Sequence, residues 1–354
     1  MDYISAKETA TKWGISQRRV ATLCSEGRVD NAMFIGNAWI IPCNAIKPLD
    51  ARKKDVSSKP TVAKPFLKWA GGKSQLLKEI SALYPFSNNP NITKYAEPFV
   101  GGGAVLFDIL NKYELNEVYI SDINSELINT YTQIRDHLDL LLEILKQLEN
   151  DYLALNNDER RAFYGAKRTR FNELKDKAES KLELAALMIF LNKTCFNGLY
   201  RVNRKGGFNV PMGAYKNPLI CDSHNLRAVS KKLQNVQIIC GDYKDSDSFI
   251  DDKTFVYFDP PYRPLTSTSN FTSYTESLFN DKNQLELANF VQDLDNKGAK
   301  IIISNSDPKN TDENDNFFDD AYAKQTIKRI SATRMINRNS EKRGRISELL
   351  ISNF

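Results

Sequence analysis

From residue 94 to residue 306, short apolar runs alternate with segments in which apolar residues recur at helical spacing. The first apolar run is followed by the helical pattern "AVLFDIL", and the second is followed by the helical pattern "ELINTYTQI". Such alternation is typical of a parallel sheet whose two faces are covered by helices. The runs that predict its strands are "KYAEPFV" (94–100), "EVYISDI" (117–123), "VQIICGD" (236–242), "TFVYFDP" (254–260) and "AKIIISNS" (299–306).

More than a hundred residues separate the second run from the third, whereas a crossover between parallel strands needs only about a dozen. Most of them have a polar helical pattern, in "LDLLLEILKQLENDYLAL" and "ERRAFYGAKRTRFNELKDKAESKLELAALMIFLNK". We therefore expect an inserted helical subdomain at about 135–225. Basic residues crowd its middle, a pattern that is usually a solvated helix face: Arg160, Arg161, Lys167, Arg168 and Arg170.

The first 46 residues have the pattern of a separate small domain. Ser5 and Glu8 form a capping box for one helix, and Ser16 starts a second helix, "SQRRVATLCSEG". The stretch "AMFIGNAWIIP" alternates about Gly36 and Asn37 as a β-hairpin does. Residues 1–46 are therefore predicted to fold as two helices and a hairpin.

The segment 47–64, "KPLDARKKDVSSKPTVAK", has almost no periodic apolar residues and predicts a linker. Residues 65–354 form one predicted domain, and a hydrophobic fraction of 41% can supply its core. No run approaches the roughly 20 apolar residues that cross a bilayer, and the start of the chain lacks a signal-peptide pattern. We therefore expect a cytoplasmic protein with no membrane partner.

Charge and cysteine usage narrow the classes of partner only slightly. The formal net charge of +5 fits a nucleic-acid partner without requiring one. The 5 cysteines are scattered, and only 2 histidines could join them as metal ligands. We expect reduced thiols and no structural zinc.

Ligands of open α/β sheets bind at the carboxyl ends of the strands. After the first predicted strand, the glycines at 101–103 let the backbone approach a ligand closely, although a plain tight turn explains such a run about as often. Asp122 ends the second strand, where a carboxylate can accept hydrogen bonds from two ribose hydroxyls. Asp242 ends the third strand, where it could accept from an adenine amino group. These strand ends predict a nucleoside-shaped cleft.

The fourth strand runs into Asp259, Pro260, Pro261 and Tyr262. Proline has no amide hydrogen, so two in succession stop the strand and stiffen its tip. The Asp259 side chain and the Pro260 carbonyl then offer two acceptors and no donor. This arrangement suits the exocyclic NH2 group of a flat base, on which the Tyr262 ring can stack.

Several stretches, in a fixed order, carry a resemblance to a known family. They are "PFLKWAGGKSQLL" (65–77), "AEPFVGGGAVLF" (96–107), "LNKTCFNGLYRVNRKGGFNVPMGAYKNP" (191–218), the tetrad "DPPY" (259–262) and "NFTSY" (270–274). Together they closely resemble the Dam and DpnM-like DNA adenine-N6 methyltransferases of the alpha arrangement. The resemblance implies an α/β fold with the mixed sheet of Rossmann-like methyltransferases. It also implies that the inserted helical subdomain recognises the target. It also implies the cofactor S-adenosylmethionine, with S-adenosylhomocysteine as product.

The resemblance and the strand ends together supply candidate site residues. The candidate catalytic residues are Asp259, Pro260, Pro261 and Tyr262. The candidate cofactor-binding residues are Trp69, Lys73, Phe99, Gly101, Gly103, Asp122, Asp242 and Asp259, with Lys73 near the cofactor carboxylate. The candidate DNA contacts are Lys68, Arg168, Lys193, Phe196, Asn197, Leu199, Arg201, Asn203, Asn209 and Pro211, with Phe196 as a wedge in the base stack. Trp69 could instead be ordinary core, and Lys68 a solvated charge.

Residues 1–46 resemble the winged helix-turn-helix of excisionase and MerR-type DNA-binding domains. Gln17, Arg18 and Arg19 would lie early in the recognition helix. The resemblance implies a second DNA contact. The alternative is a small helical module that contacts another protein.

The family resemblance implies methyl transfer to the N6 amino group of adenine in double-stranded DNA after base flipping, with GATC as the favoured site. A longer or relaxed site is the alternative. Two other functions stay open, namely a DNA-binding regulator without activity and a methyltransferase for RNA or a protein amide. We expect a monomer that is associated with the nucleoid in a bacterial or phage-type setting.

Overall fold

The protein is described by a computed structural model that covers residues 2–48, 62–69, 71–175, 177, 180–263, 279–333 and 345–354. The chain divides into two compact units, Met1–Pro60 and Thr61–Phe354. Within the described ranges, no helix is long and apolar enough to cross a bilayer. The predicted "NFTSY" motif at 270–274 and most of the predicted linker lie outside these ranges.

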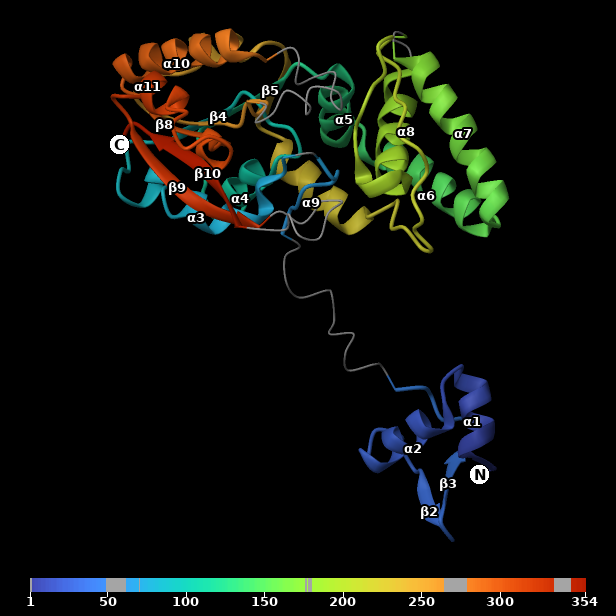
Figure 1. Cartoon of the computed structure of the whole chain (residues 1–354). Coiled ribbons are helices and arrows are strands. Elements are labelled where there is room, and N and C mark those ends of the chain that lie inside the picture. The colour runs from blue at the N-terminus through green and yellow to red at the C-terminus, as the bar shows by residue number, and fades with distance from the viewer. Residues whose placement is uncertain are drawn as a thin grey trace. The chain divides into compact units, whose positions relative to one another are not determined.

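The N-terminal unit consists of two helices and a small antiparallel sheet (Figure 1). The predicted capping box is confirmed, since Ser5 Oγ accepts from the Glu8 N–H and Glu8 Oε2 accepts from the Ser5 N–H. The predicted hairpin is also confirmed, because Gly36 and Asn37 have φ of 54° and 72°, as its tight turn requires. The elements are β1 (Tyr3–Ser5), α1 (Ala6–Trp13), α2 (Gln17–Ser25), β2 (Met33–Ile35) and β3 (Ala38–Pro42), with strand order β1-β3-β2.

The second unit is built on one seven-stranded sheet. Five of its strands are parallel, and all five were predicted from the apolar runs. A sixth strand, β10, is antiparallel to both of its neighbours, so the sheet is mixed, as the family resemblance implies. The order is β6 (Val236–Cys240), β5 (Glu117–Asp122), β4 (Lys94–Glu97), β7 (Thr254–Phe258), β8 (Lys300–Ser306), β10 (Arg345–Ser352) and β9 (Thr326–Thr333).

Side chains of each central strand alternate between two buried layers. In β7, Phe255 and Tyr257 point into one layer, and Val256 and Phe258 point into the other. In Figure 1, α10 and α11 cover one face of the sheet, and α3, α4 and α9 lie on the other. These helices, with α5, are α3 (Leu77–Ser81), α4 (Ala104–Lys112), α5 (Ser125–Asp136), α9 (Ser223–Leu233), α10 (Asp281–Asn296) and α11 (Phe317–Ala321).

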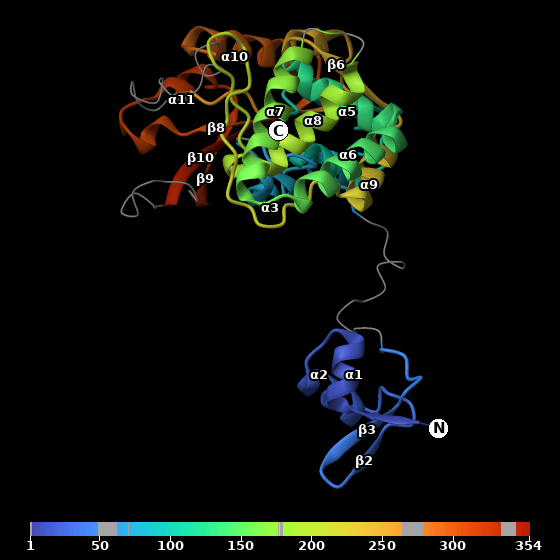
Figure 2. The same ribbon diagram turned by 90° about the vertical axis from the view of Figure 1, so that its right-hand side faces the viewer.

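The inserted residues form a helical layer beside α5 (Figures 1 and 2). The continuous helical pattern of the sequence is divided there into α6 (Leu138–Ala154), α7 (Asn157–Leu174) and α8 (Lys181–Thr194). Helix α8 packs against α5, α6 and α7, and its side chains from Leu184 to Asn192 are all buried. Because this stretch is buried all round, it shows no amphipathic stripe, and every residue in it except Asn192 is apolar.

In the turn between β4 and α4, the three glycines at 101–103 leave no room for a side chain. Gly103 has φ of 71°, and a Cβ atom there would lie 2.5 Å from Tyr131 Oη and 3.0 Å from Phe107 Cε2. Tyr131 Oη in turn donates a hydrogen bond of 3.1 Å to the Gly101 carbonyl. Both rings are buried, so neither can yield without disturbing the core.

We predict that Gly103→Ala lowers the free energy of unfolding of the cofactor-free protein by about 1–3 kcal/mol, because it combines a strained φ with an overpacked site. Urea denaturation measures the change. Gly165→Ala in α7 is the matched control: a Cβ there meets nothing within 4 Å, so this variant should gain about 0.5–1 kcal/mol. Equal stability of Gly103→Ala and the wild type would contradict the packing described above.

Candidate active site

The parallel strands β4, β5, β6 and β7 all end on the same side of the sheet, the side of their carboxyl ends. The strand order reverses there between the neighbouring strands β4 and β7. Ligands of open α/β sheets bind at such a point. Asp122 ends β5, and Asp259 directly follows β7. The structure therefore brings these two candidate carboxylates to one edge of the sheet.

The Asp259 carboxylate is held by two side chains, Lys73 and Ser304. Lys73 Nζ lies 2.6 Å from Oδ1 and 2.7 Å from Oδ2, and Ser304 Oγ donates to Oδ1 at 2.9 Å. Ser304 itself accepts from Tyr257 Oη at 3.0 Å. An ionised carboxylate has about four lone-pair directions. One direction, on Oδ2, is thus left without a partner among the described residues.

The Lys73 ammonium group is fully engaged. Its side chain is only 4% exposed, and its third contact is the Gly71 carbonyl at 2.8 Å. Because an ammonium group has three N–H donors, these contacts use all of them. The sequence prediction placed Lys73 at the carboxylate of a cofactor, whereas the structure places it on Asp259.

Tyr262 is held at one face of its ring and at its hydroxyl group. Lys73 Nζ lies 4.6 Å from the centre of the ring, and Tyr262 Oη donates to Glu348 Oε2 at 2.7 Å. Burial, with the charges of Asp259 and Glu348, raises the pKa of Tyr262 well above its ordinary value. The hydroxyl therefore stays protonated and keeps its hydrogen bond to Glu348.

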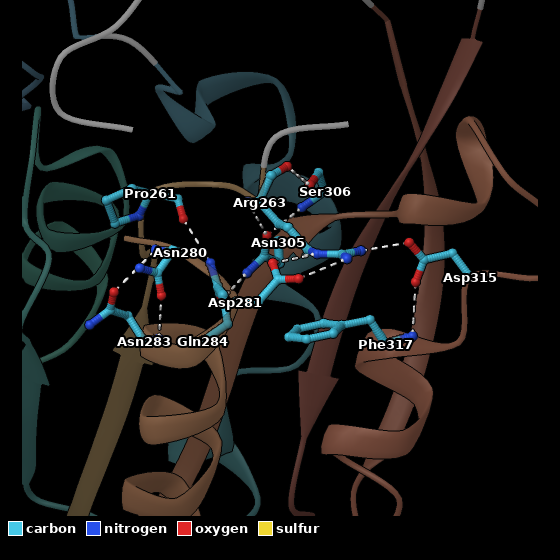
Figure 3. Close-up of polar contacts among 10 residues, drawn as sticks. All are labelled: Pro261, Arg263, Asn280, Asp281, Asn283, Gln284, Asn305, Ser306, Asp315 and Phe317. Carbon is cyan, nitrogen blue, oxygen red and sulfur yellow. Dashed lines mark hydrogen bonds and ion pairs between the residues drawn. The ribbon is translucent and has the colours of Figure 1, made fainter. Parts of the chain in front are cut away.

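The other side of the tetrad is held by amides, as Figure 3 shows. Gln284 Nε2 donates to the Pro261 carbonyl at 2.9 Å, and Asn305 Nδ2 donates to Gln284 Oε1 at 3.1 Å. Arg263 follows the tetrad, and its guanidinium group forms ion pairs with Asp281 and Asp315. No hydrogen bond to the Pro260 carbonyl occurs within the described part of the chain.

The glycine turn packs against the segment that carries Lys73. A Cβ atom on Gly101 would lie 2.9 Å from Trp69 Cδ1, so only glycine allows this approach. The Trp69 ring stacks on Tyr200 with centroids 5.3 Å apart. Asp122 Oδ2 accepts from the Gly101 N–H at 3.1 Å. Burial raises the pKa of Asp122, while hydrogen bonds from backbone N–H groups oppose that rise.

Two other candidates at the strand ends have structural partners. Phe99 stacks on Tyr243 with centroids 5.4 Å apart. Asp242 is exposed, and its carboxylate accepts from the Lys244 N–H at 3.0 Å, which caps the short helix η5 (Tyr243–Ser248). Beside Asp122, the Ile123 side chain is 61% exposed and offers apolar surface at the same edge.

The candidate DNA contacts lie mainly on the segment that follows α8. Phe196 and Asn197 occupy a short turn, η4 (Phe196–Gly198), in which Asn197 has φ of 56°. Phe196 is 52% exposed, and its backbone N–H donates to the Pro211 carbonyl at 2.8 Å. An exposed ring on a turn that is held by a backbone hydrogen bond is suited to insertion between bases.

The remaining candidates differ in how freely they can reach a partner. Arg201 is exposed, and its Nε donates to Asn209 Oδ1 at 2.8 Å. Asn203 Oδ1 closes its own turn by accepting from the N–H groups of residues 205 and 207. Leu199 packs against the main core. Lys193 is half-buried, and burial lowers its pKa, although Asp222 opposes this.

Lys68 and Arg168 complete the set. Lys68 is exposed, and its Nζ donates to Tyr215 Oη at 3.2 Å. Arg168 is half-buried on α7. The backbone of Lys68 is fixed by the buried Asn192, which accepts from its N–H and donates to its carbonyl and to the Gly198 carbonyl.

Sequence reasoning missed four residues that shape the site: Ser304, Gln284, Asn305 and Asn192. Each is a buried polar residue, and a buried polar residue requires a partner. A signal was present for Ser304 and Asn305, because "SNS" ends a predicted strand at the ligand edge. The partners of Gln284 and Asn192 are distant in sequence and could not be identified.

Comparisons with known proteins place the chain in context. A family model described as D12 class N6 adenine-specific DNA methyltransferase matches residues 69–336. The chain is 50% identical to the type II methyltransferase M.MjaIII of Methanocaldococcus jannaschii, over 82% of this chain and 99% of that protein. It is 39% identical to the type II methyltransferase M1.LlaDCHI of Lactococcus lactis subsp. cremoris, over 82% and 95%. It is 36% identical to a DNA adenine methylase of Haemophilus influenzae, over 84% and 97%.

We predict that Asp259→Ala lowers the free energy of unfolding by about 3 kcal/mol, because it leaves a buried ammonium group without its counter-charge. The double variant Lys73→Met with Asp259→Ala should recover most of this loss. Chemical denaturation of the cofactor-free proteins measures both changes. As a control, Arg227→Met breaks an exposed ion pair with Asp139 and should change stability by less than about 1 kcal/mol. A double variant that is as unstable as Asp259→Ala would show that the ion pair does not carry the effect.

Proposed function

The chain belongs to the family of D12 class N6 adenine-specific DNA methyltransferases, and from this premise and the site we propose its detailed activity. It is a DNA adenine-N6 methyltransferase. In our proposal it uses S-adenosylmethionine, acts on double-stranded DNA at GATC and takes the adenine out of the duplex before the transfer. The observation that carries the proposal is the pair of acceptors at the tip of β7.

The two acceptors match the two hydrogens of an amino group. Asp259 Oδ2 retains one lone-pair direction, and the Pro260 carbonyl has no described partner. Hydrogen bonds from the N6 amino group to both acceptors favour a pyramidal nitrogen, whose lone pair then leaves the ring conjugation. Lys73 covers one face of the Tyr262 ring, so the purine would stack on the other face. In this proposal, most of the rate enhancement comes from holding the amino group in the correct position for the transfer.

The residues at the strand ends fit S-adenosylmethionine. Asp122 offers a carboxylate for ribose hydroxyls, and the exposed Ile123 offers apolar surface for a purine. Helix α4 begins after Gly103 without a side-chain cap, which suits an anionic group. When bound, the cofactor supplies an electrophilic methyl group on a sulfonium. A role for Lys73 at the cofactor carboxylate requires one of its present contacts to be exchanged.

A base inside a duplex cannot reach the tip of β7, so the proposal includes extrusion of the adenine. In the proposal, Phe196 fills the space that the base leaves, which its exposure supports. Arg201, oriented by Asn209, can fork onto the acceptors of a guanine, and Lys68 can reach a second guanine. These contacts, with the family resemblance, support GATC. The type II names of two relatives support a role beside a restriction nuclease.

For the N-terminal unit we propose a second DNA contact of the winged helix-turn-helix kind. Two helices joined by a short turn and followed by a hairpin support this assignment, and Arg18 is exposed near the start of α2. The matched family model begins at residue 69, after this unit ends. A protein-binding module remains the alternative function of the unit.

We predict that the wild-type chain, expressed in a host without DNA methylation, places N6-methyladenine at GATC, as read by sequencing that reports modified adenine. Asp259→Asn should lower turnover by about 100-fold or more, since it removes a charged acceptor at the reacting nitrogen, and should leave S-adenosylhomocysteine binding measurable. Asp251→Asn is the control, because Asp251 lies at the opposite end of β7 and pairs with Lys94. Modified RNA or protein without modified DNA would refute the proposal.

We predict that Arg18→Glu in the full chain weakens binding to a GATC duplex by roughly 3- to 10-fold at low salt, with the methylated site unchanged. Fluorescence anisotropy over a series of salt concentrations measures this. Lys7→Glu, an exposed charge reversal on α1, is the control and should have a smaller effect. If Arg18→Glu binds DNA as the wild type does, the unit is not a DNA contact.

A further inference from the structure

We propose that Gln284 and Asn305 are positioning residues for methyl transfer, which act as a relay of two amides that holds the Tyr262 ring in register with the two acceptors. The proposal rests on the adenine-N6 activity described above. Neither amide touches the reacting atoms. Both act through the backbone of the tetrad (Figure 3).

The relay runs from strand β8 to the tetrad in a single direction. Asn305 Oδ1 accepts from the Ser306 N–H at 2.9 Å, which leaves Asn305 Nδ2 as the donor to Gln284 Oε1 at 3.1 Å. Gln284 Oε1 is thereby an acceptor, so Gln284 Nε2 is the group that donates to the Pro261 carbonyl at 2.9 Å. Each of the two side chains is only 1% exposed, so water cannot replace these bonds.

The hydrogen bond to Pro261 fixes the backbone torsion that the two prolines leave soft. The pyrrolidine rings set φ of Pro260 and of Pro261. A residue before proline is itself restricted to extended ψ, which limits ψ of Asp259 and of Pro260. The torsion ψ of Pro261 has no such restriction, and it decides where Tyr262 lies relative to the Pro260 carbonyl. A bond to the Pro261 carbonyl therefore fixes the ring relative to the acceptors.

The residue after Tyr262 is anchored to the same helix. Arg263 Nε and one terminal nitrogen contact the two carboxylate oxygens of Asp281 at 2.8 and 3.0 Å. Asp281 and Gln284 lie one turn apart on α10, whose start is fixed by a capping box at Asn280 and Asn283. Tyr262 is thus held from both sides by one helical turn.

Gln284→Glu tests the relay, because it keeps the shape of the side chain but makes the donor depend on pH. Burial raises the pKa of a carboxyl group at this position. Below that pKa the protonated group donates to the Pro261 carbonyl, and above it a carboxylate faces that carbonyl and repels it. We expect kcat of the variant to be about 10- to 100-fold below wild type at high pH and to approach the wild-type value as the pH falls. KM for a GATC duplex should change far less than kcat.

Two further variants keep the test decisive. Gln292 lies on the same helix, and its amide donates to Asn296 Oδ1. The ratio of kcat of Gln292→Glu to kcat of the wild type should therefore not change with pH. Gln284→Met preserves volume but removes both polar groups, and it should show a loss of kcat that is independent of pH. If Gln284→Glu fails to fold, Gln284→Met decides the question alone.

A ratio of kcat for Gln284→Glu to wild type that stays near one at every pH would overturn the relay, and so would full kcat in Gln284→Met. Both outcomes are separate from failure of the proposed function, which would appear as a wild-type chain that does not methylate adenine in DNA. S-adenosylhomocysteine binding by calorimetry, unchanged in all variants, supplies a readout that does not depend on turnover.

Discussion

The ion pair between Lys73 and Asp259 is the contact on which the rest of the site depends. A buried ammonium group is tolerated only with a counter-charge, so the segment that carries Lys73 can settle only where the tip of β7 presents a carboxylate. Trp69, on the same segment, fills the space that the glycine turn leaves open. Lys68, next to it, is fastened through Asn192 to the helical insertion. One charge pair therefore joins the carboxyl ends of β4 and β5, the turn after β7 and the helical insertion.

The tetrad after β7 is stiff because backbone and side-chain constraints act together. The prolines restrict the backbone, and separate partners hold the ends: Lys73 and Ser304 at Asp259, and Glu348 at Tyr262. In the function proposed above, such preorganisation leaves little reorganisation for the moment when the base binds. Among the described residues, the acceptors left without a partner are the two that the proposed function assigns to the amino group.

The sequence predicted the parallel strands because each is a short apolar run between segments of helical spacing, and that signal is local. It predicted the capping box and the hairpin of the N-terminal unit for the same reason. Strands β9 and β10 were not predicted. In β9, the adjacent charges of Lys328 and Arg329 interrupt the apolar pattern. Gln284 and Asn192 act through contacts with segments 20 or more residues away, which no local pattern encodes.

The position of Glu348 has a consequence for biosynthesis. Strand β10 is inserted between β8 and β9, although it follows both of them in the chain. A ribosome-bound chain that has emerged only as far as β9 can pair its parallel strands, yet it has no carboxylate to receive the Tyr262 hydroxyl. Strand β10, which leaves the ribosome after β8 and β9, thus completes the wall behind the tyrosine. A nascent chain that has not yet released β10 lacks the carboxylate that holds Tyr262 in place.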